Sequence, residues 1–102
     1  MSQGPRVSMV ELGLKYMQEC NRIEPWARRI DVEHEQLSDK KKEAIDKALE
    51  LIYEAGSSVR IAALQAPDNA TLTGGQARLD EIENLLRAVL QRNDVLNAQG
   101  RN

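Results

Sequence analysis

The chain has 102 residues, of which 41% are hydrophobic and 3% aromatic, and its formal net charge is −2. A chain of this length forms one domain that buries only about 60 to 70% of its unfolded surface, so its stability is marginal. The small negative charge gives no field that would draw it to nucleic acid or to an acidic membrane. Its longest apolar run, 61–64, is far shorter than the roughly 20 residues of a membrane span. One cysteine and no secretion signal predict a cytoplasmic protein.

The N-terminal part predicts a helix with two apolar sides. Residues 1–6 have nothing to bury and are expected to be disordered, so the domain is predicted to span 7–98. Ser8 and Glu11 have the spacing of a capping box, which predicts a helix from Ser8 to about residue 22. Its apolar residues fall into two sets, Val10, Leu14 and Met17 on one face and Leu12, Tyr16 and Cys20 on another.

Pro25 predicts a break after this helix. Proline disfavours helical geometry at the residue before it and suits the first turn of a new helix. Trp26, Ile30 and Leu37 lie four and seven residues apart, which one helical face would collect. Residues 30–33 also alternate like a strand, but no other stretch offers it a partner, so a second short helix is preferred.

A long helix is predicted over 39–66, with Ser38 or Asp39 as its cap and Pro67 as its stop. Its apolar residues recur in steps of four and three: Ile45, Leu49, Ile52, Gly56, Val59 and Ala63. The stretch 56–58, Gly-Ser-Ser, has two interpretations, because a glycine on the apolar face permits close helix packing whereas this triplet also suits a kink or an end. We expect a continuous helix.

The last helix is predicted over 73–98, after a loop at 66–72 and before a frayed end at 99–102. Thr73 and Gln76 have capping-box spacing. The apolar series of this helix is Leu79, Ile82, Leu86 and Val89, continued through Asn93 to Leu96 and flanked by Leu85 and Leu90. Asn93 has two interpretations: a buried polar residue that fixes register, as in coiled coils, or a solvated side chain on a fraying end.

These elements predict an all-α fold, a small bundle of three or four helices built on a long antiparallel hairpin of 39–66 and 73–98. Leu51, Ile61 and Leu64 fall outside the face that this hairpin would bury. Together with the two-sided first helix, they indicate more apolar surface than one short chain needs. We therefore expect a homodimer whose second subunit completes the bundle.

No residue cluster predicts catalysis, a metal site or a cofactor. His34 is the only histidine, and Glu33 and Glu35 point away from it on a helix. Cys20 lacks the base, cation or helix N-terminus that activates a thiol, so it is expected to be a buried structural residue. The basic clusters 28–29 and 40–42 are diluted by acidic neighbours, which argues against nucleic acid binding.

The chain has more apolar helix surface than one domain needs and no predicted catalytic, metal or cofactor site. These two features predict a small regulatory protein that occludes or sequesters a larger protein client, as an antiactivator, an immunity protein or a secretion chaperone does. The alternatives are a structural subunit of a helical assembly and, with less support, a small DNA-binding regulator. We expect neither an enzyme nor a membrane protein. The residues predicted to contact a client or a second subunit are Leu12, Tyr16, Leu51, Ile61, Leu64, Leu85, Asn93 and Leu96.

Overall fold

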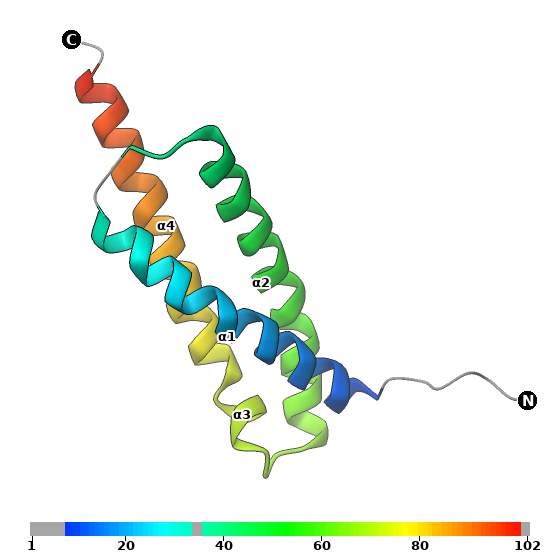
Figure 1. Cartoon of the computed structure of the whole chain (residues 1–102). Coiled ribbons are helices and arrows are strands. Elements are labelled where there is room, and N and C mark those ends of the chain that lie inside the picture. Colours follow the sequence, from blue (N-terminus) through cyan, green and yellow to red (C-terminus); the bar gives the residue numbers. More distant parts are fainter. Residues whose placement is uncertain (1–7, 34–35, 101–102) are drawn as a thin grey trace, which may run out of the picture.

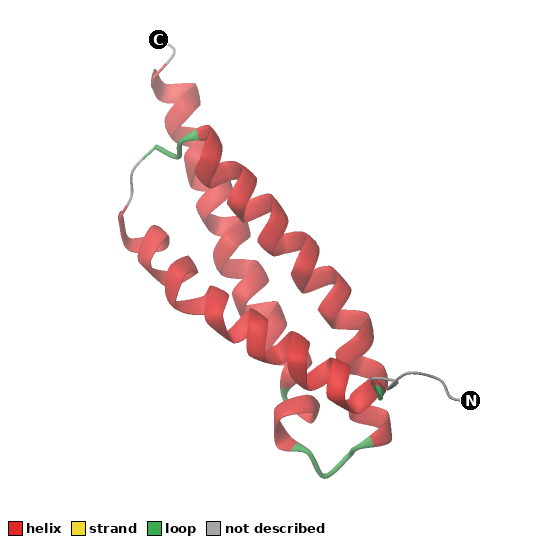
Figure 2. Cartoon of the chain, turned by 45° about the vertical axis from the view of Figure 1, so that its right-hand side comes forward, coloured by secondary structure: helices red, strands yellow, loops and turns green. Residues whose placement is uncertain are grey.

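The computed structural model describes residues 8–33 and 36–100, and these residues confirm the all-α prediction. They form the helices α1 (Met9–Glu33), α2 (Asp39–Gln65), α3 (Ala70–Thr73) and α4 (Gly75–Gly100), with no strand in the described ranges. Helices α1, α2 and α4 lie side by side as three long rods, and α3 closes one end (Figures 1 and 2). No helix in these ranges is long and apolar enough to cross a bilayer.

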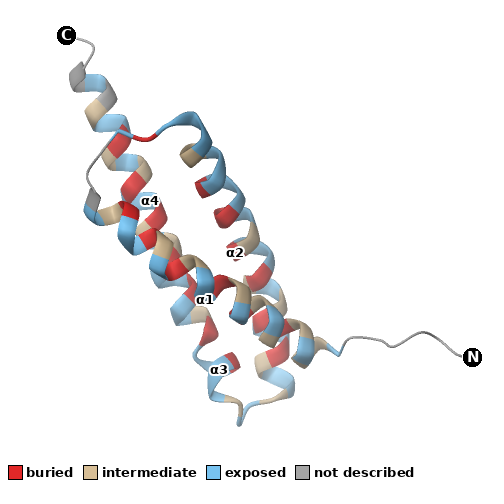
Figure 3. Cartoon of the chain, viewed as in Figure 1, coloured by how far each residue is buried: buried red, intermediate tan, exposed pale blue. Residues whose placement is uncertain are grey.

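The core is aliphatic and lies between the three long helices. Buried residues face inward on each helix and exposed residues face outward (Figure 3). On α4 the predicted apolar series is confirmed, since Leu79, Ile82, Leu86 and Val89 are at most 3% exposed. Helix α2 packs more extensively on α1 than on α4. The bundle therefore depends on three helix pairs, α1–α2, α1–α4 and α2–α4, and the predicted hairpin of 39–66 and 73–98 as its basis stays a prediction.

Helix α1 runs unbroken through Pro25, so the predicted break and second short helix were wrong. A proline inside a helix removes one backbone hydrogen bond and costs about 3 kcal/mol. Pro25 itself points to solvent, whereas Cys20 before it and Ala27 and Ile30 after it are buried in the core. Burial of core residues on both sides of the proline offsets this local cost, so α1 continues as one helix.

Helix α2 is continuous through Gly56, as expected. Ser38 is its cap, with the Lys41 backbone N–H donating to Ser38 Oγ at 3.2 Å. A side chain added at Gly56 would meet nothing within 4 Å, so this glycine does not serve close helix packing. Its carbonyl oxygen instead accepts a hydrogen bond from Gln76 Nε2 at 2.6 Å, which links α2 to α4.

The predicted start of the last helix at Thr73 was wrong. Thr73 ends α3, a short helix within the predicted loop, and α4 begins at Gly75. Asn69 caps α3 by accepting from the Leu72 backbone N–H at 3.3 Å. Gln76 is not part of a capping box, because its side chain reaches α2. Helix α4 continues to Gly100, two residues beyond the predicted end.

Two glycines mark the closest approaches between helices. A Cβ placed on Gly13 would lie 2.6 Å from the Cβ of Ala62, so α1 and α2 meet almost backbone to backbone there. A Cβ on Gly75 would lie 2.6 Å from a Val59 methyl. From the Gly13 contact α1 and α2 diverge toward their other ends (Figures 1 and 2).

Candidate functional site

The contact between α1 and α4 is bridged by ion pairs. Glu24 is only 9% exposed, and its carboxylate forms two ion pairs. Its Oε2 lies 2.9 Å from Nη2 of Arg28 on the same helix, and its Oε1 lies 2.7 Å from Nη2 of Arg78 on α4. Farther along, Arg92 Nη1 lies 3.2 Å from Asp31 Oδ1, and its Nη2 donates to the Asp31 carbonyl oxygen at 2.7 Å. Charged groups on both helices thus bridge this side of the bundle, which also has a hollow of about 300 Å³ lined by Arg28, Glu81, Asn84 and Leu85.

Polar side chains also bridge α2 and α4. The Tyr53 hydroxyl donates to Glu83 Oε2 at 3.4 Å, and Arg87 holds the same carboxylate at 2.7 Å. The Arg87 guanidinium also lies over the Tyr53 ring, 5.7 Å from its centroid, a cation–π contact. Together with the Gln76 hydrogen bond to Gly56, these contacts cover the second side.

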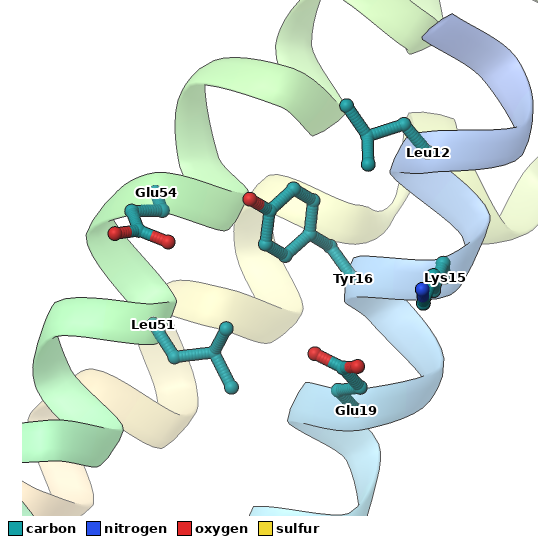
Figure 4. A pocket seen from close by; sticks show the side chains of 6 residues that line it. All are labelled: Leu12, Lys15, Tyr16, Glu19, Leu51 and Glu54. Atoms are coloured by element: carbon teal, nitrogen blue, oxygen red, sulfur yellow. The ribbon is translucent and has the colours of Figure 1, made fainter. Parts of the chain in front are cut away.

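The third side, between α1 and α2, is open and is lined by large apolar side chains together with charged ones. It holds two hollows that share Leu51, and together we call them the α1–α2 groove. The first, of about 260 Å³, is lined by Leu12, Lys15, Tyr16, Glu19, Leu51 and Glu54 (Figure 4). The second, of about 470 Å³, is lined by Arg22, Ile23, Trp26, Ala44, Lys47, Ala48 and Leu51. Among the residues that the structure describes, none of these side chains makes a hydrogen bond or ion pair across the groove.

The groove follows from a heptad-like spacing on both helices. On α1 its residues recur in steps of four, three, four and three: Leu12, Tyr16, Glu19, Ile23 and Trp26. On α2 they recur in steps of three, four and three: Ala44, Lys47, Leu51 and Glu54. Such spacing keeps one stripe of a helix facing a neighbour that runs alongside it. In this bundle α4 packs on another side, so no helix of the described chain covers these stripes.

The large apolar side chains of the groove are only partly buried by the fold. Leu12, Tyr16, Ile23, Trp26 and Leu51 all have intermediate exposure. Figure 4 shows the Tyr16 ring and Leu51 extending from opposite helices into the space between α1 and α2. Each Å² of this apolar surface that a partner buries contributes about 25 cal/mol of favourable free energy to binding. The groove is therefore the best-formed candidate for a protein contact.

The structure brings three of the predicted interface residues together and separates the others. Leu12, Tyr16 and Leu51 line the groove. Ile61 and Leu64 lie on the outer face of α2, 44% and 79% exposed, away from the groove lining. Leu85 is half-buried on α4 beside a shallow hollow shared with Arg28. Leu96 has intermediate exposure near the end of α4.

Asn93 is buried inside the chain, at 2% exposure. Its Oδ1 accepts a hydrogen bond from the backbone N–H of Leu37, in the connection between α1 and α2, at 2.8 Å. The solvated interpretation of Asn93 was therefore wrong. The side chain fixes a connection within the chain, as a buried polar group with a satisfied partner does.

Of the two sequence candidates for chemistry, Cys20 is described by the structure and does not line the groove. Cys20 is fully buried in the core and belongs to the lining of neither hollow. Burial, with a smaller contribution from the neighbouring Glu19 carboxylate, raises the pKa of the Cys20 thiol from 9.0 to about 11. His34 lies outside the described residues, and the described ranges contain no group of three or more His, Cys, Asp or Glu placed to hold a metal.

The raised thiol pKa predicts a stability loss in alkali. Because the folded state holds the Cys20 proton more tightly than the unfolded state, this contribution is complete below pH 9 and declines as the pH rises toward 11. Between pH 9 and 10 the wild-type free energy of unfolding should fall by about 1 kcal/mol more than that of Cys20→Ala. Urea unfolding of both proteins at each pH measures the difference, and parallel pH curves would contradict it.

Sequence reasoning missed the second half of the groove. The first helix was predicted to end near residue 22, before Ile23, and Trp26 was assigned to a second helix, although the spacing of both residues from Leu12 and Tyr16 continues the same stripe. The basic residues Arg22 and Lys47 gave no signal, because single cations on exposed helix faces are common. Comparison with protein-family models, curated proteins and solved structures finds no match to this chain.

Proposed function

We propose that this protein is a small regulatory binding module that occludes or sequesters a larger protein client. The observation that supports it is the α1–α2 groove, an open side with large apolar side chains on a bundle whose other two sides are bridged by polar contacts. A binding module needs such a surface and no reactive group. The α1–α2 groove is such a surface in the described part of the chain. The Cys20 thiol is not reactive, because it is buried and protonated at neutral pH.

The shape of the groove suits an amphipathic helix of the client. From Leu12 to Trp26 it follows α1 for about 21 Å at 1.5 Å per residue, which is the length of four helical turns. Helices that dock in grooves insert apolar residues spaced i, i+3, i+4 and i+7. Such anchors would pack between the aromatic residues Tyr16 and Trp26 of α1 and Leu51 of α2. Aromatic side chains at the centre of a contact commonly carry much of its binding energy.

Leu51→Asp tests the proposal, because Leu51 lines both hollows and a carboxylate there would oppose an apolar anchor. We expect client affinity to fall about thirtyfold or more, which corresponds to about 2 kcal/mol. Leu64→Asp is the matched control, with the same change on the same helix at an exposed site outside the groove. The client is first identified by affinity capture from the native host, and its affinity for each variant is then measured by calorimetry.

The outcomes separate three surfaces. Loss of binding in Leu51→Asp alone supports the groove. Loss in Ile61→Asp or Leu64→Asp alone would place the client on the outer face of α2 and overturn the groove assignment. Binding that survives all three changes but is lost in Cys20→Ser would overturn the helix-surface proposal. Each variant must keep the wild-type melting temperature and circular dichroism, so that lost binding does not report unfolding.

A further inference from the structure

We propose that in the free protein the α1–α2 groove is closed by a second copy of this chain, packed groove to groove and antiparallel about a two-fold axis near Leu51. The inference rests on the groove being a binding surface, as the proposed function does. It adds that the first occupant is the protein itself, which a client must displace. The argument for this occupant comes from the charges along the groove.

The two ends of the groove have opposite charge. Glu19 and Glu54 border the first hollow, where Lys15 offsets one of the two carboxylates. Arg22 and Lys47 border the second hollow, which has no acidic residue in its lining. The first end thus carries a net charge of about −1 and the second about +2 at neutral pH. None of these side chains has an ion-pair partner in the described part of the subunit.

A two-fold axis perpendicular to the groove uses this polarity. In such an interface each patch meets its counterpart in reverse order, so the acidic end of one copy lies against the basic end of the other. Glu19 and Glu54 then face Arg22 and Lys47 of the second copy, and this set of pairs occurs twice. A parallel arrangement would place like charge against like charge at both ends, which is destabilising.

The apolar residues are complementary under the same symmetry. The first hollow presents Leu12 and Tyr16, and the second presents Ile23 and Trp26. Reversal sets each pair against the other, with Leu51 of the two copies at the centre. The α1 and α2 helices of both copies would then form a four-helix arrangement with charges at the rim and an apolar seam, the distribution found in helix bundles.

A pair of charge-reversed proteins tests the arrangement. One carries Glu19→Lys and Glu54→Lys, which makes both ends of its groove basic, and the other carries Arg22→Glu and Lys47→Glu, which makes both ends acidic. These residues are exposed or half-buried, so the fold should tolerate the changes. We expect the wild type to sediment at twice the chain mass and each variant alone to dissociate at least tenfold more readily. An equimolar mixture of the two variants should recover the dimer.

Fluorescence of Trp26, the only tryptophan, reports whether the groove is the contact. Its emission should shift to shorter wavelength as dilute wild-type protein associates, because the ring leaves water. Leu51→Asp should remove both the shift and the dimer, while Leu64→Asp should keep both. A monomeric wild type, variants that still form homodimers, or a dimer without the Trp26 shift would each overturn this inference.

The test also separates this inference from the proposed function. A wild-type monomer that binds its client through Leu51 would overturn the dimer and leave the client proposal standing. If the dimer depends on the groove but Leu51→Asp leaves client affinity unchanged, the client proposal is overturned and the dimer stands. If both hold, client affinity measured by titration should weaken as the protein concentration rises, because the two partners compete for one surface.

Discussion

Leu72→Ala should lower the free energy of unfolding by about 2 to 5 kcal/mol, the range for a leucine removed from a packed core. Leu72 belongs to the four-residue helix α3, yet it is fully buried. Its Cδ2 methyl reaches within 3.0 Å of the position of a Cβ on Gly13, where α1 meets α2. The side chain thus fills the end of the bundle, and its loss leaves a cavity that the two close-packed helices cannot collapse to fill.

Thermal unfolding measures this effect, and a loss of 2 kcal/mol should reduce the melting temperature by roughly 8 °C or more. Leu64→Ala is the control, because Leu64 is 79% exposed and its truncation should change stability by less than about 0.5 kcal/mol. If the two variants melted together, α3 would be an ordinary surface turn and not part of the core.

Asn93→Leu should lower the free energy of unfolding by about 1 to 3 kcal/mol, although leucine is apolar and close in size. The change leaves the buried Leu37 backbone N–H without its acceptor, and an unsatisfied buried donor carries the full cost of its lost hydration. The effect should be local as well as global, so the Leu37 amide should exchange its hydrogen with solvent faster under native conditions.

Asn84→Leu provides the matched control for this change. It replaces an exposed asparagine on the same helix, and its effect should stay within about 0.5 kcal/mol. Urea unfolding gives the stabilities, and hydrogen exchange followed by NMR gives the Leu37 rate. An unchanged Leu37 exchange rate in Asn93→Leu would show that this hydrogen bond does not hold the connection.

The all-α class and the inner face of α4 could be predicted because they depend on local signals. Leu79, Ile82, Leu86 and Val89 repeat regularly, and all four are buried. The Ser8 cap was also predicted, and the Glu11 backbone N–H donates to Ser8 Oγ at 3.1 Å. Such contacts join residues a few positions apart, so the sequence pattern contains both partners.

The errors arose where contacts between distant residues outweigh local preference. Pro25 normally ends a helix, but burial of Ala27 and Ile30 continues α1. Thr73 and Gln76 have capping-box spacing, but the Gln76 amide finds the Gly56 carbonyl 20 residues earlier in the chain. No periodicity within one segment carries that information.

The candidate groove was predicted only in part, and the reason is the false break at Pro25. Ending the first helix near residue 22 separated Trp26 from Leu12 and Tyr16, so the stripe along α1 was cut in two. Cys20 was grouped with these residues on the second apolar face, whereas it lies in the core. On a continuous helix the same stripe runs from Leu12 and Tyr16 through Glu19 and Ile23 to Trp26, and it leaves Cys20 out.

The hydrogen bond from Leu37 to Asn93 also sets an order of events during synthesis. The two residues are 56 positions apart, so α1 and α2 are complete well before the side chain that fixes their connection has been made. Helix α2 ends at Gln65, 28 residues before Asn93, so at about 5 to 20 residues per second this delay lasts roughly 1 to 6 s. Throughout that interval the nascent chain carries two amphipathic helices whose inner faces await α4. The C-terminal quarter of the chain therefore decides when the apolar core is withdrawn from chaperones and from neighbouring nascent chains.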